Sequence, residues 1–275
     1  MLTAQEKLVQ LEALLGDMKR VCIGYSGGVD STFLAKVATN VLGEDALCII
    51  AVSESYPEHE RYEAEQFAAE LGLHTLTVNT HEIDNPDYRR NDSMRCYHCK
   101  KEMVSHLKAI AAERRIPHIL IGTNYDDLGD YRPGQQAAKE EGVRSPLVEV
   151  EMTKDDIRIL SKEMNIPTWN KPSFACLSSR VPYGQAITPE ILGKIDRAES
   201  LLREYGLSQF RVRHHDNLAR IEVLPEEMTK VLDQGAAITS ALKEMGYAYV
   251  TLDLVGYRTG SMNEVLHQIQ APARR

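Results

Sequence analysis

The chain has no apolar run long enough to cross a membrane, and residues 1–20 have an amphipathic helical pattern rather than that of a signal peptide. It also has no excess of basic residues, because 32 Lys and Arg stand against 40 Asp and Glu and give a net charge of -8. A general attraction to nucleic acid is therefore not expected. Five cysteines in 275 residues do not describe a disulfide framework. We expect a soluble, cytoplasmic protein that binds neither a membrane nor nucleic acid.

Apolar strand-like segments alternate with amphipathic helical segments in the first part of the chain. The predicted strands are 20–26, 46–53, 74–79 and 117–124, and the predicted helices include 32–42 and 57–71. Such alternation implies a parallel sheet with helices on both faces, whose ligands bind at the carboxyl ends of the strands. The sequence thus predicts an α/β fold in which the polar segments 26–31, 53–55 and 122–127 gather at one edge.

The pattern changes in the segment 166–188, which is rich in proline and small polar residues and is typical of a linker. A helix begins after it, since Thr188 and Pro189 supply a cap and a first-turn residue. The segments 209–215 and 218–224 then alternate apolar and polar residues as strands do. We therefore expect an α/β domain at 1–170 and a smaller α+β domain at 171–275.

The segment "SGGVDS", residues 26–31, joins a predicted strand to a predicted helix. A pair of glycines often makes a tight turn, so the simplest interpretation is structural. Here, however, hydroxyls and a carboxylate flank the glycines at a helix N-terminus, where unpaired N–H groups and the helix dipole favour an anion. No lysine-containing P-loop motif is present, because no GK[ST] follows. The segment predicts a phosphate-binding loop of another kind.

Three cysteines lie in polar surroundings: Cys96 and Cys99 form a CxxC pair, and Cys176 lies in the predicted linker. A CxxC alone can be a redox dithiol or two small residues at a helix start. Three thiolates can hold three irons of a 4Fe-4S cluster and leave the fourth iron open. Structural zinc needs a fourth ligand, which His98 could supply, so both metals stay open on these residues. The other two cysteines lie in apolar strands and are expected in the core: Cys22 and Cys48.

The loop resembles the pyrophosphate loop of the PP-loop ATP pyrophosphatase superfamily, whose members split ATP between the α and β phosphates and adenylate a substrate. Nearly the whole chain is similar to the LarE family of ATP-dependent sulfur transferases, which help to make the nickel-pincer nucleotide cofactor of lactate racemase. The resemblance rests on segments in the family's order: "SGGVDST", "RCYHCK", "DYRPG", "NKPSFACLSSRVPYG", "FRVRHH", "LARIEV" and "YVTLDLVGYRTGSMN". Some members of this family sacrifice one cysteine sulfur, whereas others carry three cysteines and a cluster. This chain is similar to the second type.

The resemblance implies adenylation of a carboxylate of a pyridinium dicarboxylate mononucleotide and its conversion to a thiocarboxylate. Mg²⁺ would accompany ATP, and sulfide would be delivered through a 4Fe-4S cluster bound by Cys96, Cys99 and Cys176. We expect Cys176 to be a cluster ligand rather than a sacrificial residue. The partners implied are the small-molecule substrate, a sulfide source and further copies of this chain in a homo-oligomer.

The candidate site residues follow from the loop, the strand ends and the resemblance. The nucleotide-binding candidates are Ser26, Gly27, Gly28, Asp30, Ser31, Ser53, Gly122, Thr123 and Asn124. The substrate-binding candidates are Ser179, Arg180, Arg211, Arg213, Glu222 and Arg258, and Glu199 is a further metal-ligand candidate. Arginine donates two parallel hydrogen bonds to phosphate, which favours this interpretation over solvated strand charges.

Two other functions stay open at this point. A tRNA thiolase of the same superfamily also combines this loop with a CxxC and a distant cysteine, but its RNA substrate favours a basic surface. A regulatory module that senses ATP without turnover is the alternative of another class. Release of pyrophosphate distinguishes an enzyme from such a sensor.

Overall fold

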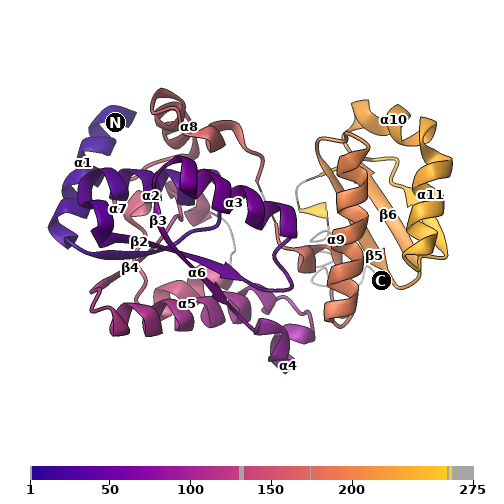
Figure 1. The fold of residues 1–275 in the computed structure, drawn as a ribbon, viewed down its shortest axis with the longest axis horizontal. Coiled ribbons are helices and arrows are strands. Elements are labelled where there is room, and N and C mark those ends of the chain that lie inside the picture. Colours follow the sequence, from indigo (N-terminus) through magenta and orange to yellow (C-terminus); the bar gives the residue numbers. More distant parts are fainter. Residues whose placement is uncertain (1, 130–132, 174, 259, 262–275) are drawn as a thin grey trace, which may run out of the picture. The chain divides into compact units, whose positions relative to one another are not determined.

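The computed structural model describes residues 2–129, 133–173, 175–258 and 260–261. The chain divides into two compact units (Figure 1). The first comprises Met1–Glu82 and Cys96–Phe174, and the second comprises Ile83–Arg95 and Ala175–Arg275. Within the described ranges, no helix is both long enough and apolar enough to cross a membrane.

The first unit is built on a four-stranded parallel sheet with the strand order β3-β2-β1-β4. Its strands are β1 (Val21–Gly24), β2 (Ala46–Val52), β3 (His74–Asn79) and β4 (His118–Ile121). The central strands β1 and β2 are continuous apolar runs because helices cover both of their faces. The predicted α/β fold with a parallel sheet is therefore confirmed.

Helices cover the two faces of this sheet, with α1 and α2 on one side and α5 on the other (Figure 1). The helices of the unit are α1 (Ala4–Met18), α2 (Val29–Leu42), α3 (Glu58–Glu70), α5 (Arg95–Glu113), α6 (Pro133–Glu140), α7 (Pro146–Glu149) and α8 (Lys154–Glu163). Cys48 packs in the core beneath α1 and α2, and Cys22 packs beneath α5. Both thiols are 0% exposed, which confirms that these two cysteines are core residues.

The second unit contains a three-stranded mixed sheet made of β5 (Phe210–His215), β6 (Leu218–Val223) and β7 (Tyr249–Leu252). Strands β5 and β6 are antiparallel, and β6 and β7 are parallel. Its longer helices are α9 (Pro189–Glu204), α10 (Met228–Asp233) and α11 (Gly235–Glu244). One face of the sheet packs on α9 and α11 through residues such as Val212, Ile221 and Leu242. Because side chains alternate along a strand, the opposite face carries the polar residues.

The segment 83–95, which includes the short helix α4 (Pro86–Arg89), belongs to the second unit. The Asn91 side-chain amide donates hydrogen bonds to the carbonyl oxygens of Val181, Pro182 and Gln185. The hydroxyls of Tyr88 and Ser178 lie 2.5 Å apart. These contacts hold the turn that follows Cys176. The segment 83–95, between β3 and α5, therefore supports the linker segment.

Candidate functional site

The loop between β1 and α2 is shaped by glycine and by two serine hydroxyls. Gly27 has φ +65°, and a Cβ atom there would lie 2.5 Å from the Cβ of Ala64, so only glycine fits without a shift. The Oγ atoms of Ser26 and Ser31 lie 3.1 Å apart, and Ser31 Oγ donates to the Gly28 carbonyl over 3.2 Å. The first turn of α2 then leaves N–H groups without intrahelical partners. Such an arrangement is suited to bind phosphate oxygens.

Asp30 connects this loop to the segment after β4. The Asn124 side-chain amide donates to Asp30 Oδ2 over 3.3 Å, and Asn124 itself is 1% exposed. A Cβ atom at Gly122 would lie 2.7 Å from the Ser31 nitrogen, so the strand end packs directly on the helix start. The structure therefore brings five of the nucleotide candidates together with Gly122 and Asn124; those five are Ser26, Gly27, Gly28, Asp30 and Ser31. Thr123 lies between Gly122 and Asn124 and is partly buried.

Lys154, the first residue of α8, completes this cluster and was not among the sequence candidates. Its Nζ atom lies 2.6 Å from Asp30 Oδ1 and 2.5 Å from Asp30 Oδ2. Burial raises the pKa of Asp30, although the nearby Lys154 ammonium opposes this effect. The two residues are 124 positions apart, so no local pattern in the sequence links them.

Ser53, the remaining nucleotide candidate, takes part in a network around Glu82. Its hydroxyl donates to Glu82 Oε1 over 2.6 Å, and the Ser55 hydroxyl donates to the same oxygen over 2.8 Å. Thr80 Oγ1 donates to Glu82 Oε2 over 2.9 Å, and Cys99 Sγ lies 3.9 Å from Oε1. Glu82 therefore ties the ends of β2 and β3 to the CxxC pair. A role of Ser53 in nucleotide binding stays a prediction.

The CxxC pair lies in the first turns of α5. Cys96 is exposed and Cys99 is partly buried. A Cβ atom at Gly134, near the start of α6, would lie 3.2 Å from the Cys96 carbonyl oxygen, so the two helix starts are close. Burial lowers the pKa of Lys100, and the Cys99 and Cys96 thiolates oppose that shift. The preceding "DYR" residues, 130–132, lie outside the described residues.

Arg180 shapes the turn around Cys176 in the second unit. Its guanidinium makes two hydrogen bonds with Glu199, of 2.9 and 2.8 Å, and both side chains are at most 3% exposed. The same guanidinium donates to the Cys176 carbonyl oxygen over 2.9 Å and to Ser179 Oγ over 3.0 Å. Burial raises the pKa of Glu199, but Arg180 outweighs it and leaves that pKa lowered. Glu199 thus neutralises Arg180 here, and its role as a metal ligand stays a prediction.

The cluster assignment depends on thiols from both units, since Cys96 and Cys99 belong to the first and Cys176 to the second. All five cysteines are free thiols. The described residues contain no group of three or more His, Cys, Asp or Glu side chains arranged to hold a metal ion. Joint binding of an iron–sulfur cluster by the three cysteines therefore stays a prediction.

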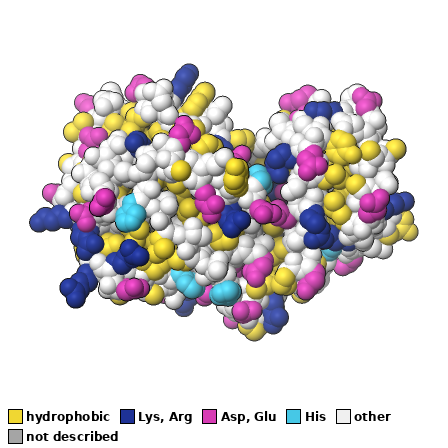
Figure 2. Space-filling model, viewed as in Figure 1, with side chains coloured by type: hydrophobic (Ala, Val, Ile, Leu, Met, Phe, Trp, Pro, Cys, Tyr) yellow, Lys and Arg dark blue, Asp and Glu magenta, His cyan; other side chains and the backbone are white. Residues whose placement is uncertain are grey.

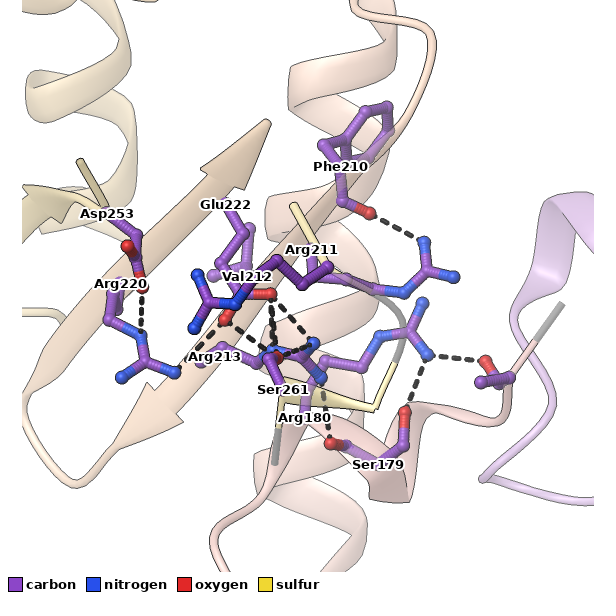
Figure 3. A network of polar contacts seen from close by, with 12 residues as sticks. Ser179, Arg180, Phe210, Arg211, Val212, Arg213, Arg220, Glu222, Asp253 and Ser261 are labelled. Atoms are coloured by element: carbon purple, nitrogen blue, oxygen red, sulfur yellow. Dashed lines mark hydrogen bonds and ion pairs between the residues drawn. The ribbon is translucent and has the colours of Figure 1, made fainter. Parts of the chain in front are cut away.

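The polar face of the second sheet carries a network of arginines and carboxylates (Figure 3). The register pairs Arg211 with Glu222 and Arg213 with Arg220, which places all four residues on one face. Arg213 donates to Glu222 Oε2 over 3.0 and 2.7 Å, while Arg220 donates to Glu222 Oε1 over 3.0 Å. Ser261 accepts a hydrogen bond from Arg213 over 2.8 Å. Glu222 is 0% exposed, so these side chains replace water as its hydrogen-bond partners.

Arg211 differs from the other arginines of this network. Its guanidinium donates to the Phe210 carbonyl oxygen over 2.6 Å and stacks over the Tyr257 ring at 5.1 Å. Within the part of the chain that the structure describes, it forms no ion pair with a carboxylate. Burial lowers the pKa of Arg211, and the nearby charge of Arg180 adds to this effect. Figure 3 shows its guanidinium on the same side of the network as that of Arg180. The nearby Glu199 carboxylate opposes the lowering of the Arg211 pKa. A role of Arg211 in binding a substrate anion stays a prediction.

A second lysine missed by the sequence analysis holds the start of the linker. Lys171 Nζ lies 2.7 Å from Glu60 Oε2 and 2.9 Å from Glu63 Oε2, both on α3. Burial raises the pKa of Glu60, but hydrogen bonds from His59 and Lys171 outweigh it and bring the pKa to about 2. The linker thus leaves the first unit from a fixed point on α3. Arg258, the last substrate candidate, donates to the Gly256 carbonyl oxygen over 3.4 Å.

Charges of both signs are mixed on the molecular face in Figure 2. Lys and Arg side chains are interspersed there with Asp and Glu side chains within each unit. This distribution agrees with the net charge of -8. It offers an RNA backbone no continuous basic stripe on that face.

The parallel sheet and the glycine–serine loop before α2 define a nucleotide-binding protein of the PP-loop class. The family model described as NAD synthase matches residues 4–109, which include this loop. Over 271 residues, the chain is 36% identical to the pyridinium-3,5-bisthiocarboxylic acid mononucleotide synthase of Lactiplantibacillus plantarum, and 98% of each chain is covered. The chain therefore belongs to the LarE family of ATP-dependent sulfur transferases within that class.

Two further relatives span similar lengths. An uncharacterized protein of Synechocystis sp. is 44% identical over 264 residues, covering 95% of this chain and 98% of its own. An uncharacterized protein of Methanocaldococcus jannaschii is 31% identical over 257 residues, covering 92% of this chain and 98% of its own. Both units thus have counterparts in these relatives.

Proposed function

We propose that this chain adenylates a carboxylate of a pyridinium dicarboxylate mononucleotide and converts it to a thiocarboxylate, as a step in making a nickel-pincer nucleotide cofactor. The observation that carries the proposal is the match over 98% of the chain to a relative named for such a product. Two anion-binding regions, one in each unit, are consistent with a nucleotide and a phosphorylated substrate. A sulfide source and a homo-oligomeric state are parts of the same proposal.

A free carboxylate resists attack by sulfide because its leaving group would be oxide or hydroxide, and adenylation removes this obstacle. An acyl-adenylate replaces that group with AMP. The loop 26–31 would bind the β and γ phosphates through N–H groups and the Ser26 and Ser31 hydroxyls. Beside this loop lie Gly122, Thr123 and Asn124, which would contact the remaining parts of the nucleotide. The Asp30 carboxylate is the hard oxygen ligand at this position that suits Mg²⁺.

Cys96, Cys99 and Cys176 would hold a 4Fe-4S cluster. The donor set fits this group, because all three are free thiols in polar surroundings and the CxxC pair lies at a helix N-terminus beside Lys100. When bound, the cluster would supply an open iron for sulfide. The protein's own contribution is to fix the Cys176 backbone through Arg180 and to tie Cys99 to Glu82.

Arg211 is the group we assign to the substrate phosphate or carboxylate. Its partly buried guanidinium lies over Tyr257 and keeps donors that no carboxylate takes among the described residues. Arg213, Glu222 and Arg258 would line the same surface. In this assignment Arg213 is fixed by Glu222 and orients the surface, while Arg211 makes the direct contact.

Anaerobic purification with iron and acid-labile sulfide analysis tests the cluster, and nucleotide analysis tests the reaction. We expect about four irons and four sulfides per chain. With ATP and the pyridinium mononucleotide, we expect AMP and pyrophosphate in amounts that depend on that substrate. Zinc in place of iron would contradict the cluster, and formation of ADP instead of AMP would contradict adenylation.

A further inference from the structure

We propose that Lys154 is a catalytic residue of the nucleotide site. Its ammonium pairs with Asp30 in this structure and, when nucleotide binds, pairs instead with the β and γ phosphates of ATP. The inference rests on the proposed function and deepens it, because it names the cation that stabilises the leaving group. Neither the loop motif nor the sequence resemblance includes this residue. It follows from the ion pair that joins α8 to the loop 26–31.

The backbone of Lys154 is held firmly while its side chain can move. Its N–H donates to Asp126 Oδ2 over 2.7 Å, and Thr153 caps the helix in a capping box with Asp156. The helix start is therefore fixed to the segment that follows β4. The side chain is 36% exposed and ends in a flexible four-carbon stem with three donors. Because the backbone of Lys154 is fixed and its side chain is flexible, the ammonium can leave one anion and pair with another nearby.

The charges at the loop favour such an exchange. Asp30 is the one carboxylate in residues 26–31, and it lies where the phosphates of ATP would bind. Lys154 makes both of its side-chain hydrogen bonds with this carboxylate, one to each oxygen. If Asp30 instead binds Mg²⁺, the Lys154 ammonium would be released to phosphate oxygens bound at the loop 26–31. The ion pair with Asp30 thus keeps the Lys154 ammonium beside the site where negative charge develops.

A second lysine pair involving the same helix provides a contrast. Lys7 lies 2.7 Å from Asp156 Oδ2, also donates to the Glu151 carbonyl oxygen, and is only 12% exposed. Asp156 accepts the capping hydrogen bonds of Thr153, so the Lys7 pair stabilises the helix start. Asp30 has no such capping role, and its pair lies on the loop. Lys7 is therefore a matched control for Lys154.

The chemical step needs a cation at this place. An oxygen of the substrate carboxylate forms a bond to the α-phosphorus of ATP, and the bond from that phosphorus to the bridging oxygen of the β-phosphate breaks. The electron pair leaves on pyrophosphate, and no proton is transferred. The Lys154 ammonium would donate hydrogen bonds to the pyrophosphate oxygens as this charge appears. Stabilisation of developing charge by one fixed donor accounts for about 10²- to 10³-fold in rate.

Calorimetric binding of inorganic pyrophosphate, with and without Mg²⁺, tests the proposal independently of turnover. In the purified full chain we expect K154M to weaken pyrophosphate binding about tenfold and to lower AMP formation about 10²-fold or more, with K154R partly active. K7M should leave pyrophosphate affinity unchanged. A thermal melt of each variant reports whether it is folded.

A double-mutant cycle with Asp30 gives a second test of the ion pair, and it can be run with another variant of Lys154 if K154M does not fold. Without Mg²⁺, D30N should strengthen pyrophosphate binding, because it releases the Lys154 ammonium and removes a like charge. That gain should be clearly larger than the gain of the same change in a K154Q or K154M background, where no cation is released. An equal gain, or pyrophosphate affinity and AMP formation at wild-type level in K154M, would show that Lys154 is only structural. If wild type makes no AMP while K154M still weakens pyrophosphate binding, the proposed reaction fails and the assignment of Lys154 stands.

Discussion

The loop 26–31 and the arginine face, to which we assign the nucleotide and the substrate, are built in different ways. The loop is contiguous in sequence, and its binding groups are backbone N–H groups and short hydroxyls shaped by Gly27. The arginine face draws side chains from β5, β6 and the turn after Cys176, and most of their charge is neutralised internally. We therefore expect changes in the loop to remove function without removing stability, whereas on the arginine face Arg213 contributes to stability and Arg211 to binding.

Removing the polar side chains of the loop should have the largest effect on activity. We expect D30A and S31A each to lower AMP formation by about 10²-fold or more, because they change the phosphate site. The buried face of α2 carries apolar residues such as Phe33 and Leu34, which these changes leave intact, so the fold should persist. Coupled assay of AMP and far-ultraviolet circular dichroism measure the two effects. AMP formation at the wild-type rate in both variants would refute the assignment of the loop.

Removing Arg213 should lower the stability of the second unit. R213A leaves the fully buried Glu222 with fewer partners, and breaking a buried ion pair costs about 3–5 kcal/mol. Arg220 and Ser261 still contact Glu222, so we expect a loss near the lower end of that range. Urea unfolding measures it. A loss below about 1 kcal/mol would mean that Arg213 does not stabilise the fold. It would contradict the assignment of a structural role to Arg213 and a binding role to Arg211.

Removing Arg211 should instead affect binding. R211A should weaken binding of the pyridinium mononucleotide by about tenfold or more, since it removes a hydrogen bond to a charged group worth about 1.5–3 kcal/mol. Stability and ATP affinity should change little, because Arg211 has no carboxylate partner among the described residues. Titration calorimetry with each ligand is the measurement, and R211K is the matched variant. Equal losses for substrate and ATP would contradict the separate roles of the two regions.

The smallest effect is expected at the two core thiols. Burial raises the pKa of Cys22 to about 11 and that of Cys48 to about 12. Their contribution to stability is therefore present below pH 9 and is lost as the pH rises toward these values. Alkylation of the folded protein at pH 9 should modify Cys96, which is exposed, and spare both core thiols. Mass mapping of the peptides checks this, and C48A should retain the iron content of wild type.

The sequence predicted those parts of the molecule that depend on local patterns. The alternation of apolar runs with helical segments was sufficient to predict a parallel sheet, and the glycine pair was sufficient to predict a tight turn between β1 and α2. Phosphate binding by that turn stays a prediction. The alternation in β5 and β6 predicted which residues share a face within each strand. The pairing of Arg211 with Glu222 depends on the turn that sets the register, so it could not be read from either strand.

Long-range contacts account for what the sequence analysis missed. Lys154 meets Asp30 only after the chain has passed through β2, β3 and β4. Glu82 becomes buried because three hydroxyls from the ends of β2 and β3 converge on it. Asn91 reaches the turn after Cys176 across about ninety residues. No local pattern marks any of these positions, since each partner satisfies a polar group brought in by the fold.

The number of sulfur atoms transferred per chain tests the central claim most directly. The reduced, iron-loaded protein is given ATP, the pyridinium mononucleotide and excess sulfide under anaerobic conditions, and thiocarboxylate, AMP and intact protein mass are followed together. We predict that product exceeds the number of chains, that AMP rises in equal amount, and that residue 176 is still cysteine at the end. One thiocarboxylate per chain, with dehydroalanine at residue 176, would contradict the account.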